Sequence, residues 1–326
     1  MFACGSEDTR AAEDPSGVVG DIRSNVTWKT GTKLTGVVKI FEGATVEIEP
    51  GAKISCVESA QIQVGGTLRT RSSGAHAVIS CGRWTGILVA ANGTVDLEGI
   101  DLANTEIGIE TTKQAGLASL TDARIENSAR PFRVGADSTL NLTRVVATTP
   151  TTLRDFDVSV SEVFGNLVAK YVDYEANTNE GIMVMRGGEA LIEDSTLKAK
   201  NGLDLVSSYG GKSLVVRYTT MNGAHCGPHI DASKDADRVP TESFEIDHVT
   251  SESNQYGITI YATSTTGNHV VKESNLQGEN AWLDLQGDHG LITFSNVFAT
   301  GQPTIANTAP PVLQLTTTRI ESARPR

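Results

Sequence analysis

The residues best suited to chemistry lie in the second half of the 326-residue chain, where carboxylates and an imidazole recur on similar short segments. These residues are Asp204, His229, Asp231 and Asp284, each within or beside an apolar-x-apolar pattern. Close carboxylates can divide acid and base roles, because like-charge repulsion separates their pKa values. The four residues are therefore the candidate catalytic groups, and a solvated polar face without catalysis is the alternative.

The most irregular segment, residues 222–240, adds a second concentration of ionisable groups. It holds His225, Cys226, His229 and Asp231, followed by Lys234 and Arg238. A His-Cys-x-x-His-x-Asp arrangement has the donor atoms of a transition-metal site, but not the usual ligand spacing, so we assign no metal. The candidate ligand-binding residues are His225, Lys234, Arg238 and Tyr261. An ordinary surface loop is the alternative, although loops on rigid frameworks often carry function.

The apolar-x-apolar pattern recurs along the chain and indicates the elements that position these groups. Its leading apolar residues stand at 107, 132, 156, 182, 203, 230, 258 and 283. Such short strands cannot bury a core alone, but they can stack coil upon coil around a continuous apolar interior. The units are also too short for βαβ crossovers. We therefore predict an all-β, right-handed parallel β-helix of about eleven coils. An antiparallel sandwich is the alternative, and it would need hairpin turns between the strands.

In such a coil the middle residue of each repeated strand points outward. This predicts one outward column that runs through Gly108, Arg133, Asp157, Met183, Asp204, His229 with Asp231, Thr259, Asp284 and Thr304. Neighbouring members would lie about 4.8 Å apart, the distance between adjacent strands. The three aspartates and His229 would then form an acidic groove. Aromatic side chains that could stack on a sugar are Tyr209, Tyr256, Tyr261 and Trp282.

Two stretches carry a resemblance to a known family. Residues 37–54, VVKIFEGATVEIEPGAKI, resemble the opening coils of the pectate-lyase-like right-handed parallel β-helix superfamily. Trp84-Thr85-Gly86-Ile87 is similar to a rung of bacterial surface β-helix lipoproteins. The superfamily includes lyases, hydrolases, epimerases, tailspikes, adhesins and non-catalytic lipoproteins, and fold alone does not select among them.

The resemblance extends to catalytic signatures only incompletely. Residues 202–205 resemble a polygalacturonase strand, but Asn201 stands where those enzymes carry Asp, and their GHG and RIK triplets are missing. A lyase of this superfamily would use Ca²⁺ and a catalytic arginine, for which Arg217 and Arg238 are available. Tyr261, His229 and Asp231 are similar to the Tyr-His-Asp grouping of mannuronan epimerases. We expect no cofactor, with Ca²⁺ implied only if the chain is a lyase.

The first residues, Met1-Phe2-Ala3-Cys4-Gly5-Ser6, resemble the end of a bacterial lipobox, which makes Cys4 the candidate lipidation site. We expect residues 1–17 to be a flexible tether and residues 18–315 to form one β-helix domain. That domain would include an N-terminal cap over residues 18–34 that contains Trp28, and residues 316–326 would form a C-terminal tail. Cys56 and Cys81, 25 residues apart, would stack on adjacent coils, either as a disulfide in an exported protein or as two buried thiols.

Composition limits the partners. The formal net charge of −12 disfavours nucleic acid, and no apolar run is long enough to span a membrane. Membrane attachment would thus depend on a lipid anchor. We expect a secreted or outer-membrane-anchored protein of the bacterial cell envelope, a non-catalytic scaffold or binding surface for polysaccharide or an envelope protein. The alternatives are a polysaccharide lyase, hydrolase or epimerase with an acidic groove, and an adhesin or tailspike-like module.

Overall fold

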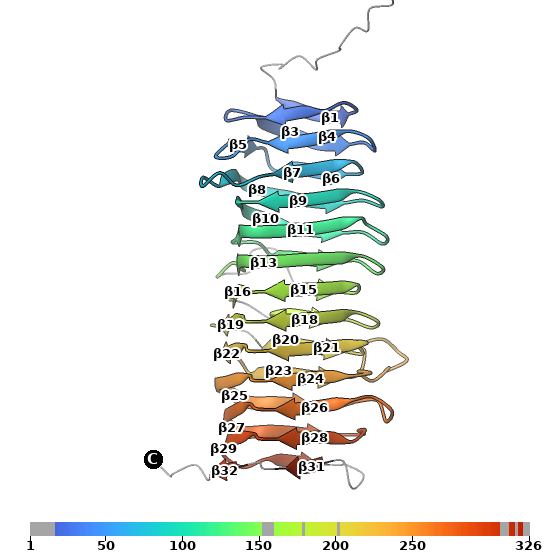
Figure 1. Cartoon of the computed structure of the whole chain (residues 1–326), viewed down its shortest axis with the longest axis vertical. Coiled ribbons are helices and arrows are strands. Elements are labelled where there is room, and N and C mark those ends of the chain that lie inside the picture. Colours follow the sequence, from blue (N-terminus) through green and yellow to red (C-terminus); the bar gives the residue numbers. More distant parts are fainter. Residues whose placement is uncertain are drawn as a thin grey trace, which may run out of the picture.

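The chain forms a stack of parallel β-coils in the computed structural model (Figure 1). The structure describes residues 17–151, 160–177, 180–200, 203–306, 313–316 and 319–321. Cys4, Asp157 and Asn201 lie outside these ranges. The described residues make strands and turns and no helix, so no helix in them could cross a membrane. The predicted all-β parallel β-helix is confirmed, with about twelve turns where we expected about eleven.

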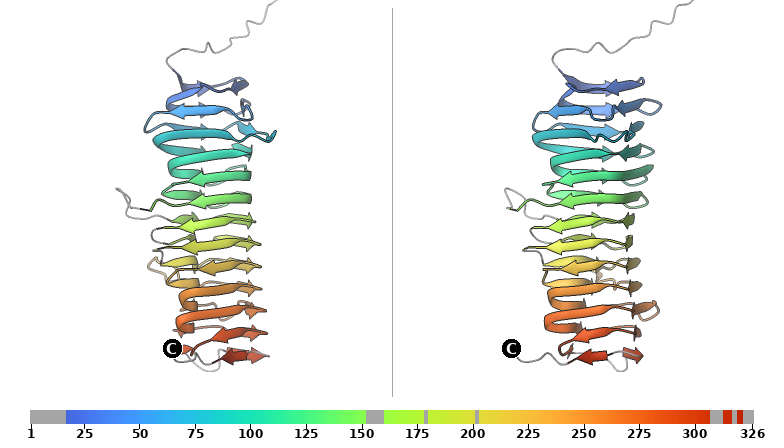
Figure 2. Two further views of the ribbon diagram at one scale, coloured as in Figure 1. Left: turned by 90° about the vertical axis from the view of Figure 1, so that its left-hand side faces the viewer. Right: turned by 60° about the vertical axis from the view of Figure 1, so that its left-hand side comes forward.

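Three parallel sheets run the length of the stack, and each coil adds one strand to each sheet (Figure 2). Sheet 1 contains β1 (Val18–Ile22), β3 (Lys33–Ile40), β6 (Gln61–Val64), β8 (Ala77–Val89), β10 (Ile100–Thr111), β12 (Arg130–Val134), β14 (Ser161–Val163), β17 (Ile182–Val184), β20 (Asp204–Tyr209), β23 (Cys226–Asp231), β25 (Thr250–Ile260), β27 (Asn275–Gln286) and β30 (Thr304–Ala306).

Sheet 2 contains β2 (Val26–Trp28), β4 (Thr45–Ile48), β7 (Thr67–Thr70), β9 (Thr94–Glu98), β11 (Leu117–Glu126), β13 (Thr139–Thr148), β15 (Asn166–Lys170), β18 (Glu189–Glu193), β21 (Ser213–Arg217), β24 (Phe244–Asp247), β26 (His269–Lys272), β28 (Ile292–Ser295) and β31 (Leu313–Thr316). Sheet 3 contains β5 (Lys53–Cys56), β16 (Asp173–Ala176), β19 (Thr196–Ala199), β22 (Thr220–Asn222), β29 (Phe298–Thr300) and β32 (Arg319–Glu321). Long strands such as β10 and β25 turn a corner and belong to both sheet 3 and sheet 1.

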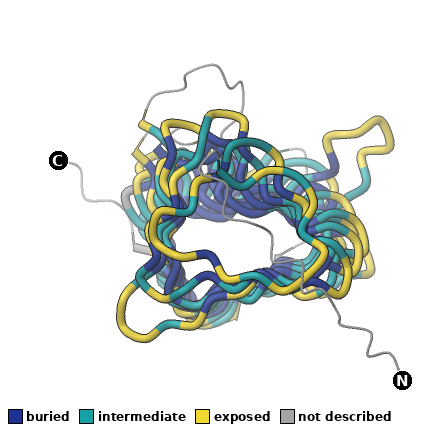
Figure 3. Tube along the Cα trace, turned by 90° about the horizontal axis from the view of Figure 1, so that it is seen from above, coloured by how far each residue is buried: buried dark blue, intermediate teal, exposed yellow. Residues whose placement is uncertain are grey.

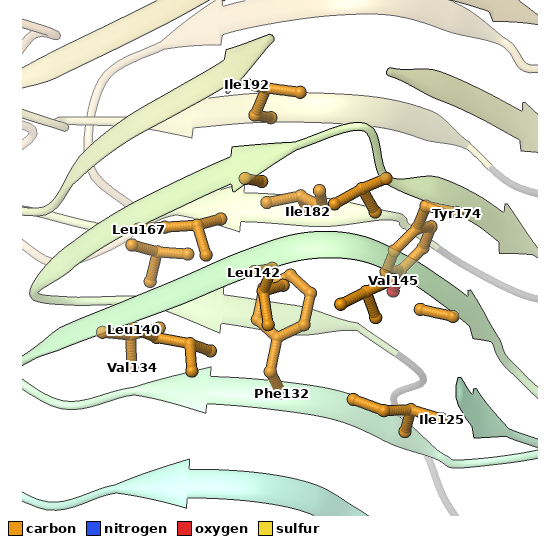
Figure 4. Packing of buried hydrophobic residues seen from close by; sticks show 14 of the residues in the cluster. Ile125, Phe132, Val134, Leu140, Leu142, Val145, Leu167, Tyr174, Ile182 and Ile192 are labelled. Atoms are coloured by element: carbon orange, nitrogen blue, oxygen red, sulfur yellow. The ribbon is translucent and has the colours of Figure 1, made fainter. Parts of the chain in front are cut away.

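The core fills the inside of the coil because buried and partly exposed residues alternate along the strands. In β18 and β21, for example, every second residue is buried, as period-2 side-chain alternation requires. Seen from above, most exposed residues lie on the outer turns, whereas buried residues line the walls of the coil (Figure 3). Inward side chains of successive coils pack together, with the Phe132 and Tyr174 rings edge-to-face at 6.1 Å (Figure 4). Burying each such large side chain contributes about 1.5–3 kcal/mol.

A single residue in the left-handed backbone region makes the corner between sheet 2 and sheet 3, which we call the left-handed corner. In successive coils this residue is Gly99, Asp122, Arg144, Tyr171, Asp194, Tyr218, His248, Glu273 and Asn296. The amide that would otherwise be left unpaired at this bend donates to the next coil, as Asp194 N–H does to the Arg217 carbonyl at 3.1 Å. The corner therefore extends the ladder of backbone hydrogen bonds around the coil.

The two ends differ from expectation. Residues 18–34, which we predicted to be a cap, form the first coil itself, because β1 and β2 pair in register with β3 and β4. Trp28 is buried, as an inward residue of that coil. At the other end β32 pairs with β29, so the ladder continues to Glu321 instead of ending at residue 315. Between β5 and β8, Cys56 and Cys81 form a disulfide with their Cα atoms 5.1 Å apart.

Candidate functional site on sheet 1

The outward column of sheet 1 contains some of the predicted residues and replaces others. Its members in the middle of the stack are Met183, Ser207, His229, Thr259 and Asp284, each paired with the next. Nearer the N-terminus the column contains Glu110 where Gly108 was predicted, because Glu110 pairs with Arg133. The column therefore contains His229 and Asp284, whereas Asp204 and Asp231 lie beside it.

The prediction that Asp204 belongs to the column is wrong by three residues. Val206 pairs with Ile182 of the preceding coil, so Ser207 takes the outward position, and the predicted leading residue Leu203 is 55% exposed. Asp204 instead pairs with Cys226 at the beginning of β23. The apolar stretch 203–206 offers two leading residues, and pairing with the neighbouring coils selects the later one. Asp231 pairs with Tyr209 at the other end of the same two strands.

Asp204 and His229 nevertheless meet. His229 Nδ1 lies 2.6 Å from Asp204 Oδ2, and the two side chains are only 12% and 6% exposed. Burial raises the pKa of Asp204, but the hydrogen bond and positive charge of His229 outweigh it and the pKa is lowered. Burial likewise lowers the pKa of His229, and Asp204 outweighs it, so this pKa is raised. The pair thus favours its charged form, and His229 Nε2 has no hydrogen-bond partner among the residues that the structure describes.

Two tyrosines flank the imidazole. The rings of Tyr209 and Tyr261 meet the His229 ring edge-on, at centroid distances of 5.5 and 5.1 Å. Tyr209 Oη donates to Asp204 Oδ2 at 3.4 Å, and Tyr261 Oη donates to Asp284 Oδ2 at 2.9 Å. Burial raises the pKa of both phenols, and the nearby carboxylates add to that shift. Both tyrosines therefore hold their protons at neutral pH.

Glu180, which sequence reasoning missed, completes the cluster. Ser207 Oγ donates to Glu180 Oε2 at 3.3 Å, and burial raises the pKa of Glu180. Glu180 precedes Ile182 by two residues, just as Asp204 precedes the paired Val206. The signal that could have found it is this shared offset, which becomes visible only when Val206 is taken as the leading residue.

The segment 232–240 covers this cluster. Lys234 Nζ lies 3.2 Å from Glu180 Oε1 and 3.9 Å from the centre of the Tyr209 ring. Arg186, which follows β17, holds the segment by donating to Asp235 at 3.0 Å and to Asp237 at 2.7 Å. At its base, Asp231 Oδ1 accepts from Ala232 N–H at 2.6 Å and lies 3.6 Å from Arg238. Asp231, Lys234 and Arg238 thus hold the covering segment in place.

The remaining predicted groups divide into core and cluster. Trp282 is a core residue and Tyr209 is buried within the cluster, so neither is a surface for a sugar. His225 Nδ1 lies 3.2 Å from Cys226 Sγ, and its ring meets Tyr256 edge-on at 5.2 Å. Burial raises the pKa of the Cys226 thiol, which favours the protonated thiol over a reactive thiolate at neutral pH. Sequence reasoning missed two exposed tyrosines, Tyr171 and Tyr218, at the left-handed corner.

The fold makes this chain a parallel β-helix protein. No family model and no curated protein matches it. Among solved structures it is similar to endopolygalacturonase I from Stereum purpureum complexed with two galacturonate, at 13% identity over 92% of this chain and 99% of that chain, with a TM-score of 0.37. It is also similar to endo-xylogalacturonan hydrolase from Aspergillus tubingensis, at 11% identity over 88% and 85% of the chains, with a TM-score of 0.23. Such values describe a resemblance in coiled architecture and carry no activity across.

Proposed function

We propose that this chain is a non-catalytic β-helix scaffold of the bacterial cell envelope that presents a binding surface for polysaccharide. The observation that carries the proposal is the burial of the acid–base cluster. An enzyme that acts on a polymer must bring its acid and base within hydrogen-bond reach of the substrate. Here the side chains of Asp204 and His229 are buried, Tyr209 lies beneath Lys234, and His229 Nε2 is inaccessible. Such an arrangement suits a polar network that stabilises the stack.

A candidate binding surface lies instead at the left-handed corner. Tyr171 and Tyr218 are 56% and 54% exposed, and the Tyr218 ring stacks on His248 at 4.7 Å with a 30° tilt. The two tyrosines belong to coils separated by one intervening coil, which puts them about 10 Å apart along the stack. Exposed aromatic rings with a polar edge suit the apolar face and hydroxyls of a sugar. We call Tyr171, Tyr218 and His248 the corner ridge.

Binding to immobilised bacterial and plant polysaccharides tests the corner ridge. For whichever polysaccharide the wild-type chain retains, Tyr171→Ala with Tyr218→Ala should weaken binding at least fivefold, because two stacking surfaces are removed. The matched control is Leu117→Ala with Leu291→Ala, which removes similarly exposed apolar side chains elsewhere. Unchanged binding by the tyrosine variant, or no retention on any polysaccharide, would reject the ridge as the binding surface.

We further propose that Cys4 carries a lipid that tethers the scaffold to the membrane. The support is the sequence Ala3-Cys4-Gly5-Ser6, which resembles the end of a lipobox. Mass spectrometry of the protein extracted from membranes of its native host should find an acylated Cys4, and Cys4→Ser should move the protein to the soluble fraction. An unmodified Cys4 in the extracted protein would remove the anchor and leave the scaffold proposal standing.

A second candidate function, a polysaccharide lyase or epimerase, is favoured by one observation. Asp204 accepts from His229 Nδ1, so Nε2 can act as a general acid while the imidazole is charged, and as a general base once Nε2 has lost its proton, if the segment 232–240 opens. Incubation with uronic-acid polymers, with and without Ca²⁺, separates the two functions. A scaffold yields neither unsaturated products nor epimerised residues nor new reducing ends. Turnover that is lost in His229→Ala would replace the scaffold proposal with the enzyme.

A further inference from the structure

Three side chains beside the Asp204–His229 pair bring together oxygen, nitrogen and sulfur donors. Among the described residues, Asp204, His225 and Cys226 place one ligand atom each within 4.8 Å of one another. The coil produces this grouping, because Asp204 at the beginning of β20 pairs directly with Cys226 at the beginning of β23. His225 lies in the bend just before β23, where it can turn toward the side of its neighbour.

The separations suit a small tetrahedral ion. Zinc bonds of about 2.0–2.3 Å place neighbouring ligand atoms about 3.5 Å apart in a tetrahedron. His225 Nδ1 and Cys226 Sγ lie 3.2 Å apart, which is close to that separation. All three ligand atoms lie within 4.8 Å of one another. To bind the ion, the most distant two must approach each other by about an ångström. Small changes in the side-chain rotamers of the carboxylate and the imidazole can provide this.

Surrounding groups support the three ligands. Thr259 Oγ1 lies 3.1 Å from Cys226 Sγ and can donate a hydrogen bond to a thiolate. His229 Nδ1 contacts Oδ2 of Asp204, which leaves Oδ1 for an ion. Tyr256 packs its ring against His225. Metal sites commonly have such a second layer of contacts, which orients the ligands.

We propose that Asp204, His225 and Cys226 bind a divalent transition metal of the zinc class. The thiolate and imidazole donors select Zn²⁺ or Co²⁺ over Ca²⁺, which takes six to eight oxygen ligands. Binding replaces the thiol proton of Cys226 with a metal–sulfur bond and releases that proton to solvent. Asp204 and Cys226 lie on paired strands of consecutive coils, so the ion would join those two coils. The inference uses the residues of the candidate site and stands whether the chain is a scaffold or an enzyme.

Cobalt titration of the full chain tests the proposal. Chelator-treated Cys4→Ser protein, in which Cys226 is the remaining free cysteine, is titrated with Co²⁺ and then with Zn²⁺. We expect one equivalent of Co²⁺ to produce a thiolate-to-cobalt charge-transfer band and the visible absorption of a tetrahedral ion, both abolished by Zn²⁺. Ca²⁺ should change neither signal.

Variants identify the ligands. Cys226→Ser should abolish the charge-transfer band, and His225→Gln and Asp204→Asn should each weaken Co²⁺ binding at least tenfold. His76→Gln, which alters a partly exposed histidine beside Asp101, is the matched control and should bind Co²⁺ normally. Circular dichroism checks that every variant is folded, and His225→Gln, at a partly exposed position, serves if the buried variants do not fold. Absence of the band in the wild-type sequence at millimolar Co²⁺, or its persistence in Cys226→Ser, overturns the site. Polysaccharide binding by the corner ridge is measured separately and does not depend on this outcome.

Discussion

At the scale of single residues, the Asp204–His229 pair couples two opposite pKa shifts to stability. The lowered pKa of Asp204 stabilises the folded protein when the pH is above the pKa of this group in the unfolded chain, about 3.9. This contribution is lost as the pH falls through the pKa of Asp204 in the folded protein. The raised pKa of His229 stabilises the folded protein when the pH is below the pKa of this group in the unfolded chain, about 6.5. This contribution is lost as the pH rises through the pKa of His229 in the folded protein. Both contributions are therefore complete only between these two unfolded values.

We predict that Asp204→Asn lowers the free energy of unfolding by about 2 kcal/mol near pH 5.5, because a buried charged hydrogen bond is lost. The difference from wild type should shrink toward pH 8 and toward pH 3. Urea unfolding at several pH values measures it.

The matched control is Asp101→Asn. Asp101 also meets a histidine, His76, at 2.7 Å, but the two side chains are 29% and 33% exposed. Solvent screening should keep this loss at about 0–1 kcal/mol. If the two variants lose equal free energies of unfolding, burial of Asp204 does not strengthen its interaction with His229.

At the scale of elements, each corner and each covalent link joins one coil to the next. The left-handed corner accepts charged and aromatic residues because their side chains point away from the coil, while the backbone carries the strain. A branched Cβ is the substituent that this backbone conformation tolerates least.

We predict that Asp194→Val, at φ 51°, lowers the free energy of unfolding by about 1–2 kcal/mol, whereas Asp194→Gly leaves it unchanged or slightly higher. The reason is steric, since Asp194 is exposed and its amide continues the ladder in all three sequences. Equilibrium unfolding of the three proteins measures their stabilities, which should fall in the order Gly, Asp, Val. Valine equal to aspartate would contradict the assigned corner.

The Cys56–Cys81 disulfide closes a short loop, with a sequence separation of 25. Replacing both cysteines by serine should therefore lower the free energy of unfolding of the coils that the disulfide joins by about 3 kcal/mol. Hydrogen exchange should accelerate at β5 and β8 and remain slow beyond β13, since those coils touch neither cysteine. Faster exchange throughout the chain would argue against local stabilisation.

At the scale of the whole molecule, coils contact only their neighbours, so stability should be a sum of local contributions. Phe132 and Phe294 test this, because both are fully buried and each packs against one aromatic ring, Tyr174 or Trp282. Truncating either phenylalanine to alanine should lower the free energy of unfolding of the surrounding coils by about 3–5 kcal/mol. In Phe294→Ala, hydrogen exchange should accelerate only in the last coils, whereas Phe132→Ala should affect coils on both sides of β12. Uniform acceleration in both variants would show one cooperative unit.

The sequence predicts the coiled fold because inward positions must be apolar at a regular spacing, and this requirement is visible without coordinates. The candidate site is less predictable, since its contacts join residues that are far apart in the chain. Lys234 reaches Glu180 across 54 positions, and no local pattern marks either residue for the other. Register at β20 is also hidden, because both Leu203 and Val206 satisfy the apolar pattern and the neighbouring coils decide between them.

The two ends of the stack differ, and this difference decides where unfolding and proteolysis should begin. The disulfide ties coils near the N-terminus, whereas Ile305 and Leu315 of the last coils stay exposed. Loosening should therefore begin at the C-terminal end and proceed inward one coil at a time. A protease in the surroundings would trim the molecule to a shorter column, and each remnant would keep an intact interior on the N-terminal side of the cut.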